Sequence, residues 1–147
     1  MKNIPNVTIC LVGDGSQRER LMAMIKAEKL EKNIQWVQST HDVYSYLLAS
    51  TIFLSFSRIE ALPISFLEAM KARCIIVAME YRGIEELIET TKDGIICHST
   101  NQMVRESLQI LKDGSKYERI VKQAYTKVSS QYSSQNISTY TDAIFSR

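Results

Sequence analysis

The stretch Ser55–Met70, with the sequence SFSRIEALPISFLEAM, decides the fold that we expect the rest of the chain to adopt. It follows an apolar run, Thr51–Leu54, that is short and rich in β-branched and aromatic residues, which is typical of a buried strand. Pro63 then opens an apolar segment, and proline is tolerated in the first turn of a helix because its missing N–H would have no partner there. The order strand, loop, helix predicts a parallel α/β unit, in which ligands bind where the strand ends and the helix begins.

Two glutamates frame the predicted helix start: Glu60 lies in the loop and Glu68 lies inside the helix. Helical side chains lean toward the amino end of their helix, so we expect Glu68 to point toward the loop that holds Glu60. For two glutamates taken alone, the simpler interpretation is a solvated Glu60 and a Glu68 that pairs with Lys71, three residues on. The residues around them decide between this interpretation and a ligand site.

Strands and helices are expected to alternate on both sides of this stretch, since apolar runs and apolar residues at helical spacing follow one another. The predicted strands are Val7–Val12, Ile34–Val37, Thr51–Leu54, Cys74–Ala78 and Ile95–Cys97. The predicted helices are Gln17–Leu30, Val43–Leu48 behind an Asp42 cap, Pro63–Met70, Ile84–Ile88, Met103–Leu111, Tyr117–Val128 and Asn136–Phe145. This alternation predicts an α/β domain with a doubly wound parallel sheet of about five strands and helices on both faces.

Composition restricts the classes of protein to which the chain can belong. It has 147 residues, of which 45% are hydrophobic and 23% charged, as in an ordinary globular domain. A net charge of +2, without a basic cluster interleaved with aromatic residues, argues against nucleic acid as a partner. No stretch has the pattern of a signal peptide or the length of an apolar membrane span, so we expect a cytoplasmic protein.

The cysteines and histidines show no metal-binding pattern. Cys10, Cys74 and Cys97 each lie in an apolar, strand-like run, which favours reduced cysteines in the core over disulfides or zinc ligands. His41 and His98 are far apart in the sequence, and the chain contains no Asp-x-Asp pair. We therefore expect no metal and no cofactor.

The first predicted strand ends in a Gly-Asp-Gly turn, Gly13–Gly15, before the next helix. The turn lacks the third glycine of a dinucleotide-binding fingerprint and the Gly-Lys-Ser of a Walker motif. As a free-standing motif it is therefore better explained as a structural turn than as a nucleotide site.

Together these segments resemble the donor domain of retaining glycosyltransferases of the GT-B fold, the group 1 or family 4 type, whose donor domain is Rossmann-like. The family signature has a serine, a glutamate, a small residue, Leu-Pro or Phe-Gly, and an apolar helix that reads Leu-Glu-Ala-Met. The residues that match it are Ser57, Glu60, Leu62, Pro63, Leu67, Glu68, Ala69 and Met70. The family also has a Val-Gly-Asp-Gly after a core strand, and its later Gly-Gly-x-x-Glu is matched by Gly83 and Glu86.

The chain departs from the family pattern at several positions. Arg82 replaces the first of the two later glycines, and an arginine there either blocks the approach of the backbone to a pyrophosphate or supplies its own charge. Gln38 stands where the family usually has a glycine after the second strand. Arg73 and Ile75 stand where the family introduces its next strand with glycine and proline, which affects a turn rather than the site.

The resemblance implies that residues 1–147 are a single carboxy-terminal, donor-binding domain. It would lack the amino-terminal acceptor domain and the usual first strand, which carries an arginine and a lysine for the donor diphosphate. The intact enzyme would transfer a sugar from a nucleotide diphosphate sugar with retention of configuration, in polysaccharide or glycolipid synthesis and without a metal. The isolated chain would be inactive, and a peripheral association of the intact enzyme with the inner face of the membrane is left open.

The resemblance also implies roles for individual residues. Glu60, the candidate catalytic residue, would lie near the donor sugar, and whether it acts as a nucleophile is left open. Glu68 would accept hydrogen bonds from the ribose hydroxyls, and the start of its helix would stabilise the charge that develops on the departing diphosphate. The other predicted donor-binding residues are Leu62, Pro63, Ile64, Ser57, Arg58, Gly13 and Gly83.

Two other classes of protein stay open. A non-catalytic nucleotide-sugar-binding module would keep Glu68 and the helix start, and the absence of the usual arginine and lysine favours it. A phosphoacceptor receiver domain has a similar size and alternation of elements. That class needs an acidic cluster and a central aspartate at strand ends, whereas the strand that ends at Leu54 leads into serines.

Overall fold

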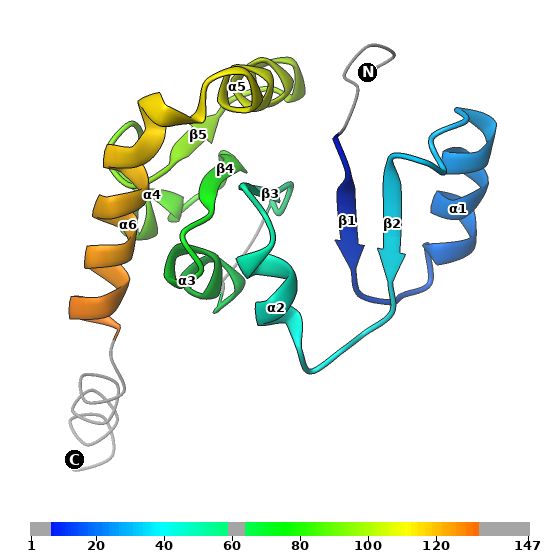
Figure 1. Ribbon diagram of the computed structural model, residues 1–147, viewed down its shortest axis with the longest axis horizontal. Helices are drawn as coiled ribbons and strands as arrows, with labels where there is room; N and C mark the ends of the chain where they lie inside the picture. Colours follow the sequence, from blue (N-terminus) through cyan, green and yellow to red (C-terminus); the bar gives the residue numbers. More distant parts are fainter. Residues whose placement is uncertain (1–6, 59–63, 133–147) are drawn as a thin grey trace. The chain divides into compact units, whose positions relative to one another are not determined.

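The computed structural model describes residues 7–58 and 64–132, and these form parallel strands with helices between them (Figure 1). The chain divides between Tyr46 and Leu47 into two compact units, which are described separately. The predicted helix Asn136–Phe145 and the residues Glu60, Leu62 and Pro63 lie outside the described residues.

The amino-terminal unit contains a two-stranded parallel sheet and one helix. β1 (Ile9–Val12) pairs with β2 (Ile34–Val37), with Ile9 opposite Ile34. Parallel strands need a crossover connection, and α1 (Arg18–Ala27) provides it. None of residues 7–46 is fully buried. This unit is therefore ordered by its strand pairing more than by a closed apolar core.

The carboxy-terminal unit contains a three-stranded parallel sheet in the order β3-β4-β5. Its strands are β3 (Ile52–Ser55), β4 (Ile75–Met79) and β5 (Ile95–Cys97). α3 and α4 connect these strands, and further helices follow β5. The helices are α3 (Ile64–Lys71), α4 (Ile84–Leu87), α5 (Thr100–Lys112), the short 3-10 helix η1 (Gly114–Tyr117) and α6 (Glu118–Gln131).

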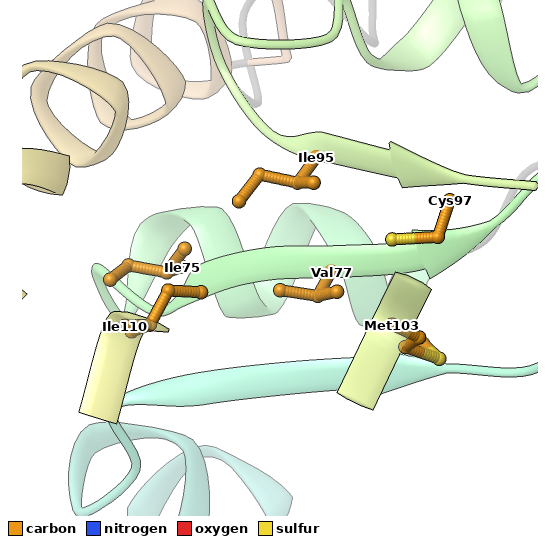
Figure 2. Packing of buried hydrophobic residues seen from close by; sticks show 6 residues of the cluster. All are labelled: Ile75, Val77, Ile95, Cys97, Met103 and Ile110. Atoms are coloured by element: carbon orange, nitrogen blue, oxygen red, sulfur yellow. The ribbon is translucent and has the colours of Figure 1, made fainter. Parts of the chain in front are cut away.

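The core of this unit is built around β4, whose first four residues are all buried. Side chains alternate along a strand, so Ile75 and Val77 face one side of the sheet and Ile76 and Ala78 face the other. On the first side, Ile75 and Val77 pack with Ile95 and Cys97 of β5 and with Met103 and Ile110 of α5 (Figure 2). The continuous apolar sequence of β4 follows from this burial on both faces.

α3 contributes a second group of buried side chains in this unit. Phe66, Ala69 and Met70 are buried, and α3 contacts both β4 and α6. The ring of Phe66 meets that of Phe53 from β3 edge to face, with centroids 5.3 Å apart. α3 follows β3 along the chain and is held in place by its packing against β4 and α6.

A short helix, α2 (Val43–Leu48), joins the two units along the chain. The Oδ1 atom of Asp42 accepts hydrogen bonds from the N–H of Ser45 at 3.3 Å and from the hydroxyl of Ser45 at 2.7 Å. This contact confirms the predicted cap at Asp42, because a carboxylate before a helix satisfies an N–H group that has no intrahelical partner.

The structure confirms the predicted α/β class with parallel strands. Every predicted strand and helix in the described residues is present, with ends that differ by a few residues. The strands are hydrogen-bonded as a two-stranded and a three-stranded sheet, whereas the sequence pattern predicted one sheet of about five strands.

Cys74 and Cys97 are buried free thiols, as predicted, and Cys10 is a half-buried free thiol. No helix in the described residues is both long enough and apolar enough to cross a membrane.

Candidate functional site

The carboxyl ends of β3, β4 and β5 lie at one edge of the three-stranded sheet. Because the strands are parallel, Ser55 at the end of β3 pairs with Ala78, and Met79 at the end of β4 pairs with Cys97. Each strand end leads toward the start of α3, α4 or α5. The unpaired N–H groups at helix starts favour anionic ligands, so this edge is the candidate site.

The chain leaves β3 through a turn fixed by Ser55. This serine is buried, and its hydroxyl oxygen accepts a hydrogen bond from the N–H of Ser57 at 3.4 Å. Ser57 is half-buried and Arg58 is exposed. α3 begins at Ile64, whose side chain is 64% exposed although it is apolar. The predicted site residues Ser57, Arg58 and Ile64 thus flank the segment 59–63, which lies outside the described residues.

Glu68 lies in α3 with an exposed side chain. The simpler interpretation of the sequence paired it with Lys71, but no such ion pair forms. Lys71 instead donates a hydrogen bond from Nζ to the hydroxyl oxygen of Ser129 at 3.0 Å, and its Nζ lies 4.9 Å from the ring centroid of Tyr125. Within the described part of the chain, the Glu68 carboxylate makes no hydrogen bond or ion pair, so it is available to a ligand.

Two side chains that were not among the predicted site residues meet at the ends of β4 and β5. Glu80 follows β4, His98 follows β5, and the Oε2 atom of Glu80 lies 2.8 Å from Nδ1 of His98. The N–H of His98 also donates to Oε1 of Gln102 at 3.0 Å, while the hydroxyl of Ser99 caps the start of α5. His98 directly follows the predicted strand Ile95–Cys97, and Glu80 lies two residues after the predicted strand Cys74–Ala78. These positions after strand ends are the signal that could have indicated the two side chains.

Gly83 is the residue before α4, and its φ of 95° lies in the left-handed region. L-residues with a Cβ atom rarely adopt this conformation, which explains a glycine at this point. An added Cβ atom at Gly83 would meet nothing within 4 Å, so the backbone conformation and not crowding requires the glycine. The neighbouring Arg82 is exposed.

Gly13, the remaining predicted donor-binding residue, belongs to the amino-terminal unit. It has a φ of 139°, and its N–H donates to the carbonyl oxygen of Val37 at 2.9 Å. The next residue, Asp14, accepts a hydrogen bond from the N–H of Gly15 at 2.8 Å and lies 3.6 Å from Arg18. These contacts with Val37 and Arg18, together with the hydrogen bond inside the motif, therefore hold Gly-Asp-Gly as a turn. The other predicted site residues described here all belong to the carboxy-terminal unit.

Comparison with known proteins identifies the family of this chain. Residues 1–127 match the family of glycosyl transferases group 1. The chain belongs to this family. An uncharacterized glycosyltransferase of Haemophilus influenzae is 32% identical over 101 residues, which are 68% of this chain and 29% of that protein.

Two Bacillus proteins are also similar over most of this chain. The N-acetyl-alpha-D-glucosaminyl L-malate synthase of Bacillus anthracis is 24% identical over 93% of this chain and 36% of that enzyme. The poly(glycerol-phosphate) alpha-glucosyltransferase of Bacillus subtilis is 24% identical over 92% of this chain and 20% of that enzyme. The chain thus spans between 20% and 36% of the length of these three relatives.

Solved structures share the fold. The Anabaena protein HepE, in complex with UDP, matches 99% of this chain and 42% of its own chain, with a TM-score of 0.88 and 21% identity. This similarity confirms the Rossmann-like architecture of the GT-B glycosyltransferases that the sequence pattern indicated.

Proposed function

We propose that this chain is the donor-binding part of a glycosyltransferase that transfers a sugar from a nucleotide diphosphate sugar with retention of configuration. The observation that carries the proposal is the exposed carboxylate of Glu68, which has no partner in the described residues and lies on the helix that follows β3. Membership of the group 1 family supports the reaction class.

The reaction breaks the bond between the anomeric carbon of the donor and the diphosphate, and forms a bond from that carbon to an acceptor oxygen. Positive charge builds on the sugar and negative charge on the leaving diphosphate. N–H groups at the start of α3 are suited to the diphosphate, and the Glu68 carboxylate is suited to the ribose hydroxyls. Glu60, which lies outside the described residues, is the candidate catalytic residue near the sugar.

The proposal includes the acceptor side of the reaction. One relative is named as a glucosyltransferase of poly(glycerol-phosphate), which supports a polysaccharide or glycolipid acceptor for this protein. The matched part of this chain covers only 20% to 36% of these relatives, which supports an amino-terminal acceptor domain in the whole enzyme. A cytoplasmic location with peripheral membrane association suits an acceptor that is presented at a membrane surface.

A titration of this chain with UDP, GDP and ADP tests donor binding, and the complex of HepE with UDP makes UDP the first ligand to try. We expect weak binding, followed through amide chemical shifts, because the usual arginine and lysine for the diphosphate are not matched in this sequence. Low-micromolar affinity would show that Arg58 or Arg82 supplies the missing positive charge.

The variant Glu68→Ala tests the role of that carboxylate in ribose binding. Loss of a charge-assisted hydrogen bond costs about 1.5 to 3 kcal/mol, so affinity should fall roughly ten- to a hundredfold. Glu19→Ala, on the exposed first turn of α1, is the matched control and should bind as the wild-type chain does. Unchanged donor affinity in Glu68→Ala would refute the ribose role. A whole protein that binds the donor but never transfers its sugar would instead favour a non-catalytic binding module.

A further inference from the structure

A hollow with a volume of about 520 Å³ lies in the carboxy-terminal unit, between the residues that precede β4 and the first turns of α6. It is near the amino end of β4, whereas the candidate donor site is at the carboxyl ends of the strands. These are opposite edges of a parallel sheet, so the hollow is a separate feature. The residues that line it are Arg73, Gly114, Glu118, Val121, Lys122, Tyr125 and Thr126.

Positive charge gathers at this hollow. The guanidinium carbon of Arg73 lies 4.3 Å from the centroid of the Tyr125 ring, and Lys71 lies 4.9 Å from the same centroid. The nearby charges of Lys71 and Arg73 and the hydrogen bond with Ser129 lower the pKa of Tyr125, with Lys71 contributing most. Lys122 adds a third cation, while Glu118 contributes a carboxylate.

Neither Arg73 nor Lys122 forms an ion pair within the described part of the chain. A cation that lines a hollow without a carboxylate partner can bind an anion without first giving up an ion pair. The arrangement therefore favours an anionic ligand over a cationic or neutral one.

The backbone at Arg73 is held in a defined turn. Its φ of 65° lies in the left-handed region, just after α3 ends, where glycine is the usual residue. Its N–H donates to the carbonyl oxygen of Met70 at 3.1 Å, and the N–H of Cys74 donates to that of Ala69 at 2.9 Å, which holds this turn. Lys29 and Thr91 share this left-handed conformation, so the turn matters here because it fixes the backbone from which the Arg73 side chain reaches the hollow.

We propose that this hollow binds an anion that carries a phosphate group, with Arg73 and Lys122 as its cationic ligands. The planar fork of a guanidinium matches two phosphate oxygens, and a lysine adds a mobile point charge. Both a soluble phosphate ester and the headgroup of an anionic phospholipid present this group. The site goes beyond the proposed donor site and does not depend on it.

Two arms of one experiment distinguish these sources of phosphate. In the first arm the whole chain is titrated with inorganic phosphate, and amide shifts of Arg73 and Lys122 are followed by NMR. In the second arm the chain is sedimented with vesicles of phosphatidylglycerol, and vesicles of phosphatidylcholine serve as the uncharged comparison. A response in the first arm supports a soluble ligand, and a response in the second arm alone supports a lipid headgroup.

Variants assign the response to this hollow. Asparagine tolerates the left-handed region, so Arg73→Asn removes the cation and keeps the turn. We expect Arg73→Asn and Lys122→Gln each to weaken binding about tenfold or more, and Glu118→Gln to strengthen it by removing a negative charge. Arg105→Gln, on the exposed side of α5, removes the same charge elsewhere and should have no effect.

Three results would overturn the proposal. One is no response in either arm, and another is a response that both Arg73→Asn and Lys122→Gln leave unchanged. The third is a response in which the amides at the start of α3 shift while those of Arg73 and Lys122 do not, since it would place the anion at the donor site. Should Arg73→Asn fail to fold by circular dichroism, the exposed Lys122→Gln decides the outcome. Because the hollow and the donor site lie at opposite edges of the sheet, failure here does not affect the proposed function.

Discussion

Cys74 is a residue whose surroundings determine its chemistry. It is 1% exposed, and its single thiol proton is shared between the carbonyl oxygens of Leu47 and Ser50, which lie 3.2 Å and 3.6 Å from Sγ. Burial raises the pKa of this thiol from 9.0 to about 11, because the thiolate would lose its hydration. The position therefore keeps the thiol neutral and unreactive at ordinary pH.

This shift predicts a pH dependence of stability. The unfolded chain releases the Cys74 proton near pH 9.0, whereas the folded chain keeps it until a pH of about 11. The stability that the neutral thiol contributes is complete below pH 9.0 and is lost as the pH rises to about 11. A loss of about 2 kcal/mol is expected over this range. Urea unfolding at pH 8 and pH 11 should show that the free energy of unfolding declines more for the wild-type chain than for Cys74→Ala. Equal declines for the two chains would contradict the raised pKa of Cys74.

At the scale of elements, α6 is tied to the turn that precedes β5 by a buried ion pair. Nζ of Lys127 donates to Oδ2 of Asp93 at 2.8 Å and to the carbonyl oxygen of Leu87 at 2.6 Å. The other carboxylate oxygen of Asp93 accepts from the N–H of Glu89 at 2.7 Å. Asp93 is buried, so both of its oxygens depend on these partners.

We expect Lys127→Met to destabilise the chain by about 2 to 4 kcal/mol, because it leaves a buried carboxylate without its counter-charge. The double variant Lys127→Met with Asp93→Asn should recover part of that loss, since it also removes the unpaired charge. Lys92→Met is the matched control: Lys92 pairs with Glu89 at 2.7 Å on the surface, and its loss should leave thermal unfolding nearly unchanged. If Lys127→Met and Lys92→Met lowered the stability equally, burial would not be the reason why the ion pair of Lys127 matters.

At the scale of the whole molecule, the two units differ in how much apolar surface they bury. The carboxy-terminal unit has a closed core in which Ile76, Val77 and Ala78 have no exposed surface. In the amino-terminal unit, Leu21, Met22 and Met24 of α1 are all exposed. Local opening requires less free energy where fewer apolar contacts are lost, so the amino-terminal unit should open first.

Amide hydrogen exchange on this chain measures that difference. We expect the amides of Ile9–Val12 to exchange at least about tenfold faster than that of Val77, because opening free energies follow local burial. Equal protection in both strands would show that the units unfold as one.

Local signals in the sequence were sufficient to predict the elements and the family. The continuous apolar run before Met79 predicted a buried strand, and Gly83, which matches a glycine of the family pattern, lies in the left-handed region in the structure. The Leu-Glu-Ala-Met helix indicated a glycosyltransferase, which the family match confirms. Periodicity, turn residues and motifs act over a few residues, so each can be recognised without knowledge of the remaining chain.

The partners of charged side chains were decided only by the tertiary structure. Helical spacing by itself suggested a pair between Glu68 and Lys71, but α6 packs against α3 and brings Tyr125 and Ser129 to Lys71 instead. Glu80 and His98 meet because β4 and β5 are neighbours, although the two residues are 18 positions apart. A charged side chain pairs with whichever group the fold brings within a few ångströms, and spacing along the chain does not carry that information.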